Sequence, residues 1–254
     1  MTSVLALRMA GPLQAWGASS RFVRRTTESA PTKSGVIGLL AAAVGIERGD
    51  DDGLARLSAL RFGVRIDQPG TRVRDFQTAH HAVTGKSMPL SERFYLADAV
   101  FVAAVEGDGT LIGSLHEALR SPVYPPYLGR RSCPPALPVD LGVHHDTDLD
   151  QVLRAETWQA SPWYQRIHRR EAMVPLVMLR DADDGARDGD VLRDQPLSFA
   201  AEHRRHGLRS VVSTTVEVPN PAALSVRSAS PARTVPPHDP FDALEGSLPE
   251  EETH

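Results

Sequence analysis

Hydrophobic patterning along residues 3–119 places segments typical of strand, helix, strand, strand and helix in that order. This order predicts an α+β fold with a ferredoxin-like (split βαβ) domain over residues 1–121. Two further observations set the limits of that domain. Six prolines between positions 122 and 138 predict a rigid connection over 122–145, and apolar runs at 173–179 and 210–218 predict a smaller β-rich C-terminal unit over 146–219. The proline-, serine- and acid-rich composition of residues 220–254 predicts a disordered acidic tail.

The first half of this domain follows from its apolar residues and its turn signals. An apolar run over Ser3–Met9 predicts a buried strand, and Gly11-Pro12 ends it. Residues 11–31 are polar and basic without a clear period, which predicts a long surface loop. Apolar positions then recur at helical spacing from Thr32, a suitable N-cap, and a second short helix is expected over Leu54–Leu60 after an acidic turn.

The second half of the domain contains one polar excursion between two strands. Alternation at Phe62, Val64 and Ile66 predicts a half-buried strand, and Phe94–Val105 predicts one continuous buried strand. Between them, residues 72–93 are polar and predict a hairpin that stands off the body. A helix is expected over Leu111–Leu119, whereas the fourth strand that a ferredoxin-like sheet needs is not located by the pattern.

Composition excludes several classes of protein. The single cysteine, Cys133, cannot form an internal disulfide, and the longest apolar run, Val36–Ile46, is about half of the ~20 residues that span a bilayer. Arg8 interrupts the N-terminal apolar stretch, so a signal peptide is not expected. The sequence therefore predicts a cytoplasmic protein without membrane contact. The net charge of −4 is uneven, because residues 238–254 hold six carboxylates and no Lys or Arg, while the first 35 residues are basic.

The junction of loop and helix at Thr32–Gly38 has the chemistry of an anion site. A helix start presents unpaired amides and partial positive charge, and Lys33 and Ser34 would add an ammonium group and a hydroxyl. The GxxxxGK[ST] pattern is absent, which disfavours a nucleoside triphosphate. An ordinary capped helix with an incidental lysine explains the same residues equally well.

Two segments mix arginines with aromatic rings, the combination that holds single-stranded RNA. The first contains Arg21, Arg24 and Arg25 near Phe22 and Trp16, although burial of Trp16 in the core is an alternative. The second lies in the proline-rich stretch, where rigid packing is an equal alternative, and contains Tyr124, Tyr127, Arg130 and Arg131.

A catalytic role has weaker support in the sequence. His80, His81, Lys86 and Tyr95 could supply the acid and base of a metal-independent ribonuclease. The sequence contains no HExxH, CxxC, GxSxG or EF-hand motif. We therefore expect a binding protein without a metal or cofactor rather than an enzyme.

Five segments taken in order resemble the CasD family, the type I-E branch of the fifth CRISPR-associated family in the RAMP superfamily. The resemblance covers about residues 3–218 and is carried by GPLQAWG (11–17), PTKSGVIGLL (31–40), RDFQT (74–78), RFYLADAVF (93–101) and YLGRRSCP (127–134). It implies a ferredoxin-like, RNA-recognition-motif-like RAMP body with a protruding thumb hairpin at about residues 78–92 and a small second β unit.

The resemblance also implies a function in antiviral defence. Members are non-catalytic subunits of the Cascade complex that grip the 5′ handle of the CRISPR RNA (crRNA), contact the subunits CasC and CasA, and meet target DNA only through the complex. The handle contacts would fall on Gln14, Trp16, Arg21, Arg24, Arg25, Lys33, Ser34, Arg93, Tyr127, Arg130 and Arg131. The alternative is a metal-independent endoribonuclease that processes repeat RNA, because a type I-C branch of the same family cuts its own precursor.

Overall fold

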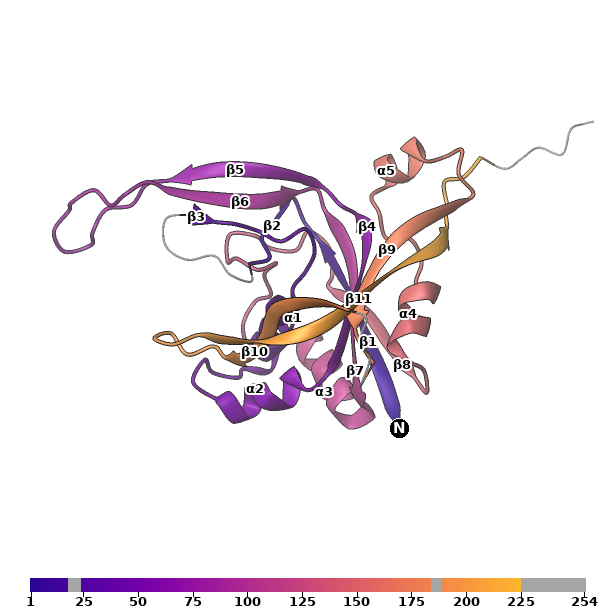
Figure 1. The fold of residues 1–254 in the computed structure, drawn as a ribbon, viewed down its shortest axis with the longest axis horizontal. Coiled ribbons are helices and arrows are strands. Elements are labelled where there is room, and N and C mark those ends of the chain that lie inside the picture. Colours follow the sequence, from indigo (N-terminus) through magenta and orange to yellow (C-terminus); the bar gives the residue numbers. More distant parts are fainter. Residues whose placement is uncertain (18–23, 184–188, 225–254) are drawn as a thin grey trace, which may run out of the picture. The chain divides into compact units, whose positions relative to one another are not determined.

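The computed structural model describes residues 1–17, 24–183 and 189–224, and Met1–Ala223 form one compact unit. The fold is mixed α and β, with a seven-stranded antiparallel sheet in the order β10-β11-β9-β4-β7-β1-β8 and a second, four-stranded sheet (Figure 1). The order of elements agrees with the α+β prediction, but the strands are distributed differently from the predicted domains.

The centre of the large sheet is built from four strands and two helices. The strands are β1 (Thr2–Ala10), β4 (Arg61–Gln68), β7 (Val100–Asp108) and β8 (Asp140–His145), and the helices are α1 (Lys33–Val44) and α3 (Gly109–Arg120). β7 and β8 flank β1. The sequence did not locate β8, which lies inside residues 122–145, a segment predicted to be only a connection.

The C-terminal strands extend this same sheet. β9 (Met173–Asp181) pairs with β4, and β11 (Arg205–Pro219) lies between β9 and β10 (Asp190–Ser198). The predicted boundaries at residues 121 and 145 therefore do not divide the sheet. Two helices that the sequence reading missed, α4 (Leu149–Ala155) and α5 (Pro162–Ile167), precede β9. The predicted tail lies outside the described residues from position 225.

A long hairpin leaves the body between β4 and β7, as the polar segment predicted. β5 (Thr71–Gln77) pairs antiparallel with β6 (Ser91–Ala97), and residues 78–90 close the hairpin at its far end (Figure 1). Short strands β2 (Leu13–Gln14) and β3 (Arg24–Arg25) flank β6 and complete the second sheet.

The single strand predicted over Phe94–Val105 is in fact two strands of different sheets. Asp98 has a φ of 57°, in the left-handed region, and lies in the turn that separates β6 from β7. The apolar run continues across this break because both strands are partly buried, so its pattern could not reveal the turn.

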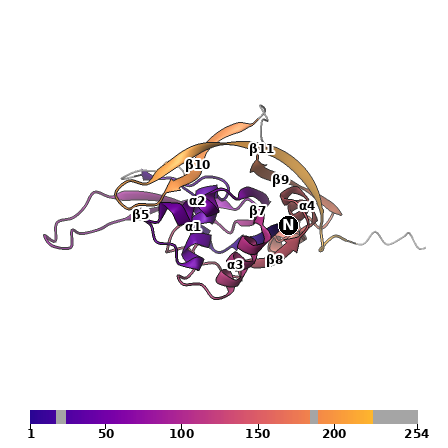
Figure 2. The same cartoon turned by 90° about the horizontal axis from the view of Figure 1, so that it is seen from below.

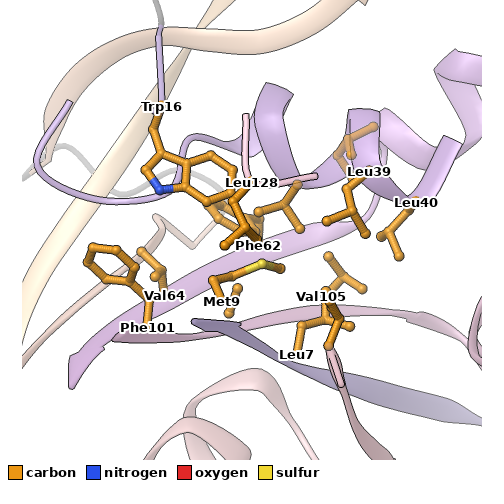
Figure 3. Close-up of a cluster of buried hydrophobic side chains, with 14 of the residues drawn as sticks. Leu7, Met9, Trp16, Leu39, Leu40, Phe62, Val64, Phe101, Val105 and Leu128 are labelled. Atoms are coloured by element: carbon orange, nitrogen blue, oxygen red, sulfur yellow. The ribbon is translucent and has the colours of Figure 1, made fainter. Parts of the chain in front are cut away.

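Each face of the large sheet has its own core. Leu5, Leu7 and Met9 of β1 face α1 and α3, whereas Val4 and Ala6 face α4 and the C-terminal strands. Figure 3 shows Trp16 and Leu128 closing the α1 side of this packing. Figure 2 shows β10 and β11 arching over α1 and α2 (Asp51–Ser58).

Burial on both faces also explains a wrong prediction for β4. Its polar residues face the second core, so the strand is not half-buried: Arg65 is fully buried and forms a bidentate pair with Asp67 at 2.7 and 2.9 Å. The guanidinium group also donates to three carbonyl oxygens of the segment 153–157. This buried ion pair therefore holds the end of α4 against the sheet.

The helix starts follow from local capping. Thr32 Oγ1 accepts from Gly35 N at 3.2 Å, as predicted, and Gly45 ends α1 with a φ of 83°. α2 begins three residues before the predicted helix because Asp50 accepts from Gly53 N, so the acidic turn is its N-cap and first turn. None of the helices in the described part of the chain combines the length and apolar character needed to cross a membrane.

Candidate nucleic-acid interface

A cleft of about 710 Å³ lies along α1, from Thr32 to Arg48. It is also lined by the proline-rich segment and by the end of β10 and the start of β11. Gly35 and Gly38 of α1 line the cleft, and neither has a side chain to fill it. The lining residues whose side chains can hydrogen-bond, carry charge or stack are Thr32, Ser34, Glu47, Arg48, Tyr124, Tyr127, Arg131, Phe199, Arg204 and His206.

The cleft combines unpaired positive charge with exposed rings. Arg48, Arg131 and Arg204 are exposed, and within residues 1–17, 24–183 and 189–224 none of the three forms an ion pair. Glu47 is the one carboxylate among the lining residues. Tyr124 is 52% exposed, so its ring is available to a ligand. Guanidinium groups beside flat rings suit phosphates and unstacked bases.

Lys33 does not reach this cleft, contrary to the prediction. Its ammonium group is buried and lies 3.0 Å from Asp181 Oδ2. Arg209 joins Asp181 at 2.7 Å and Asp194 at 2.6 Å, so two cations and two carboxylates form one internal cluster. Burial lowers the pKa of Lys33, and the nearby Asp181 carboxylate opposes that shift. Its charge is thus balanced inside the protein.

The helix start is also satisfied internally. Asp194 Oδ2 accepts from the backbone N–H of Lys33 at 2.8 Å, and Thr32 caps Gly35. A carboxylate of the same chain thus takes the place that we had predicted for a phosphate. Thr32, Ser34, Gly35 and Gly38 of the predicted junction line the cleft, and the hydroxyl of Ser34 lies 3.4 Å from that of Thr32.

Gln14 and Trp16 belong to the core rather than to a surface. Gln14 Nε2 donates to the carbonyl oxygens of Met9 and Ala99, and its Oε1 accepts from Trp16 Nε1 at 3.0 Å. The indole packs against Gly35, where an added Cβ would lie 2.8 Å from the ring. Both side chains are fully buried and have a structural role, and Trp16 also borders the cleft. Residues 14–16 are accordingly not part of a surface loop.

Arg130 fastens the second sheet. Its guanidinium group donates to the carbonyl oxygens of Phe94 at 3.1 Å and Arg25 at 3.0 Å, and it stacks over the ring of Tyr95. Arg25 itself is exposed and pairs in register with Arg93, whose Nε is buried without a partner among the described residues. Arg21 and the side chain of Arg24 lie outside the described residues.

The residues of the ribonuclease alternative are not brought together. His80, His81 and Lys86 are exposed at the far end of the hairpin, whereas Tyr95 is buried beneath Arg130. Tyr95 lies four strand positions from the end of β6 at Ser91, about 13 Å at ~3.3 Å per residue. Such a separation prevents a shared acid–base pair. In the part of the chain that the structure describes, no cluster of His, Cys, Asp or Glu could hold a metal ion.

The cleft contains residues that the sequence reading missed. Phe199, Arg204 and His206 come from the β10–β11 turn, more than 60 residues after the proline-rich segment. The sequence has a basic run at residues 203–209, but nothing in its local pattern places it beside α1. Burial, together with the charge of Arg204, lowers the pKa of His206, so its imidazole is uncharged at neutral pH.

Comparison with known proteins decides the family. The family described as CRISPR-associated protein (Cas_Cas5) matches residues 4–212, most of the chain. The chain belongs to the Cas5 family. This result confirms the resemblance noted from the sequence.

Similar proteins in this family include a curated protein and two solved structures. The Escherichia coli K12 protein described as CRISPR system Cascade subunit CasD is 37% identical over 171 residues, which cover 60% of this chain and 76% of that protein. A crystal structure of a Cas protein is 33% identical with a TM-score of 0.65, covering 87% of this chain and 97% of the other. A chain of a CRISPR RNA-guided surveillance complex is 33% identical with a TM-score of 0.69, covering 91% and 95%.

Proposed function

We propose that this Cas5-family chain is the subunit of a type I-E Cascade complex that holds the 5′ handle of crRNA without cutting it. Its similarity to a Cascade subunit and to a chain of an RNA-guided surveillance complex supports the assignment. The observation that carries the proposal is the cleft over α1, where three unpaired arginines and two tyrosines meet.

Different residues of the cleft are assigned to different parts of the RNA. Arg131 and Arg204 contact phosphates, and Tyr124 and Tyr127 stack on bases. Ser34 supplies a hydroxyl from α1. Of the handle contacts expected from the sequence, Ser34, Tyr127 and Arg131 thus remain in the proposed site, and Arg25 and Arg93 remain candidates on the second sheet.

The remaining parts of the fold have proposed roles in the same complex. A ferredoxin-like body is supported by the sequence order β1, α1, β4, β7, α3 and β8 together with the strand order β4-β7-β1-β8. The hairpin end at residues 78–92 acts as a thumb that displaces a nucleotide where handle and spacer meet. CasC and CasA are the neighbouring subunits, target DNA is met only through the complex, and the complex works in the cytoplasm.

The positions of the candidate acid and base support the proposal that the chain does not cut RNA. An acid–base pair must both reach one phosphodiester group, and the hairpin separates His81 from Tyr95. Incubation of the purified chain with repeat RNA in EDTA tests this. Specific cleavage that His81→Ala or Tyr95→Phe abolishes would establish the endoribonuclease instead.

The binding role is tested with full-length chain and a labelled RNA of the handle sequence. Anisotropy titrations over a series of salt concentrations give the slope of log K against log salt, which is about −0.7 per neutralised phosphate on a single strand. Arg131→Ala combined with Arg204→Ala should lower affinity and make this slope shallower by about 1.4.

Arg56→Ala combined with Arg120→Ala is the matched control, since both side chains are exposed, lie at helix ends and do not line the cleft. This control should leave the slope nearly unchanged. Equal effects of the two double variants, or no effect of either, would contradict the assignment of the cleft.

A further inference from the structure

The short helix α5 is fixed to the body by one side only. Tyr164 and His168 pack on the buried ring of Trp158, with centroid distances of 6.0 and 5.9 Å. Gln165 Nε2 donates to the carbonyl oxygens of Trp158 and Ala160, and Asn220 Nδ2 donates to that of His168 at 2.9 Å. These bonds satisfy polar groups on the inner side of α5 and give its outer side a defined position.

The outer side presents a ring and three cations. Trp163 is 48% exposed and Ile167 is 67% exposed, and Arg166 lies between them at helical spacing on the same face. The backbone N–H of Arg169 donates to the carbonyl oxygen of Arg166 at 3.3 Å, so the chain makes a further turn after α5 and keeps Arg169 and Arg170 near Arg166. All three arginines are exposed, and within the described ranges none has an ion pair or side-chain hydrogen bond.

The carboxylate nearest in sequence is engaged elsewhere. Glu171 Oε1 lies 3.1 Å from His168 Nδ1, and in the described part of the chain Glu171 forms no ion pair with the three arginines, so the four charged side chains together carry +2. Three guanidinium groups around one exposed indole favour a polyanion with flat rings over a protein surface, which would need its own carboxylates at each arginine. Large exposed apolar side chains on a rigid support also indicate a contact site.

This surface is separate from the cleft. Tyr164 and Trp158 pack with the core on the α4 face of the large sheet, whereas the cleft lies over α1 on the opposite face. None of the residues 161–173 lines the cleft, and Figure 1 places α5 beside β9 and away from α1. One short strand in the cleft cannot also cover α5.

We propose that the outer side of α5 is a second nucleic-acid site that binds a single-stranded segment through Trp163, Arg166, Arg169 and Arg170. The indole stacks on an unpaired base and the three arginines neutralise phosphates of the same segment. Ile167 extends the apolar contact beside the ring. An unpaired strand of RNA and one of DNA offer this same chemistry.

The chain provides its own reporter for this site. It has three tryptophans, of which Trp158 is 3% exposed and Trp16, at 0%, borders the cleft, so the part of the quenching that Trp163→Phe removes is the signal of this site. Full-length chain is titrated with an oligouridylate, with an oligodeoxyuridylate of equal length and with a blunt DNA duplex. Both single strands should quench the fluorescence saturably and the duplex should not, because its bases are already stacked. A preference for one single strand identifies the sugar that the site accepts.

Charge removal then identifies the arginines. A triple change of Arg166, Arg169 and Arg170 to Ala should weaken the quenching titration on the order of 10- to 100-fold near 0.1 M salt, since three phosphates contribute a slope of about 2. Arg56→Ala combined with Arg120→Ala serves as the matched loss of surface charge. Circular dichroism verifies that each variant is folded.

The outcomes separate this site from the cleft. Arg131→Ala combined with Arg204→Ala should leave the Trp163 response intact while weakening handle binding, and the α5 triple variant should do the reverse. Loss of the Trp163 response in the cleft variant, or no quenching by either single strand, overturns the proposal. Quenching only on assembly with other subunits of the complex would also overturn it, in favour of a protein interface.

Discussion

Asp194 should be one of the residues on which stability depends most. Its carboxylate is 1% exposed and accepts three hydrogen bonds: from the backbone of Lys33 at 2.8 Å and from Arg209 at 2.6 and 2.9 Å. Asp194→Ala leaves these donors unpaired in the interior. Breaking a buried ion pair costs about 3–5 kcal/mol. Because Arg209 keeps its bond to Asp181, the expected loss is at the lower end, about 3 kcal/mol.

Urea denaturation followed by circular dichroism measures this loss, and thermal melts should show a Tm lower by about 6–12 °C for a unit of this size. The matched control is Asp190→Ala, an exposed position on the same strand, which should change stability by less than about 0.5 kcal/mol. A loss below about 1 kcal/mol for Asp194→Ala would show that the cluster does not hold the start of α1 against β10 and β11.

Three further sites, His206, Gly129 and Arg65, can be tested by substitution. Burial lowers the pKa of His206 in the free protein, whereas the phosphates of a bound handle favour its charged form. Affinity for the handle should therefore rise as the pH falls from neutral towards about 6. His206→Gln should flatten this pH profile in anisotropy titrations. The same lowered pKa makes the unfolded state the first to take up this proton, so folding stability should fall in that range. Gly129→Ala should abolish soluble protein or lower Tm sharply, because φ is 81° and the added Cβ would overlap a backbone oxygen, whereas Gly85→Ala, with a φ of 65° and open space, should cost only about 1–2 kcal/mol. Arg65→Ala should cost about 3–5 kcal/mol in urea unfolding, and Arg65→Met with Asp67→Leu should cost clearly less; similar losses for both would contradict a penalty from the unpaired buried charge.

Local signals were enough for much of the fold. α1 begins after its N-cap Thr32 and ends at Gly45, because a capping hydrogen bond and a left-handed glycine depend only on residues a few positions away. The hairpin β5–β6 could be predicted from its polar composition. β8 could not be placed, because its partner β1 lies more than 130 residues away and its own residues are only half-buried.

The candidate site was predicted only in part, for a related reason. Lys33 has the residue type and position of an anion ligand, but its partners Asp181 and Asp194 lie 148 and 161 positions along the chain. Pairing at that separation is set by the strand order of the large sheet, which sequence patterning does not give. The same strand order brings Arg204 and His206 to the cleft, where a basic turn alone carried no sign of function.

The most direct test of the central claim is the path of the handle in a cryo-electron microscopy structure of this chain assembled with crRNA and its partner subunits. Nucleotides of the 5′ handle are expected in the cleft over α1, with phosphates at Arg131 and Arg204 and a base against Tyr127. A cleft filled by side chains of a neighbouring subunit, with the handle running elsewhere on the chain, would contradict it.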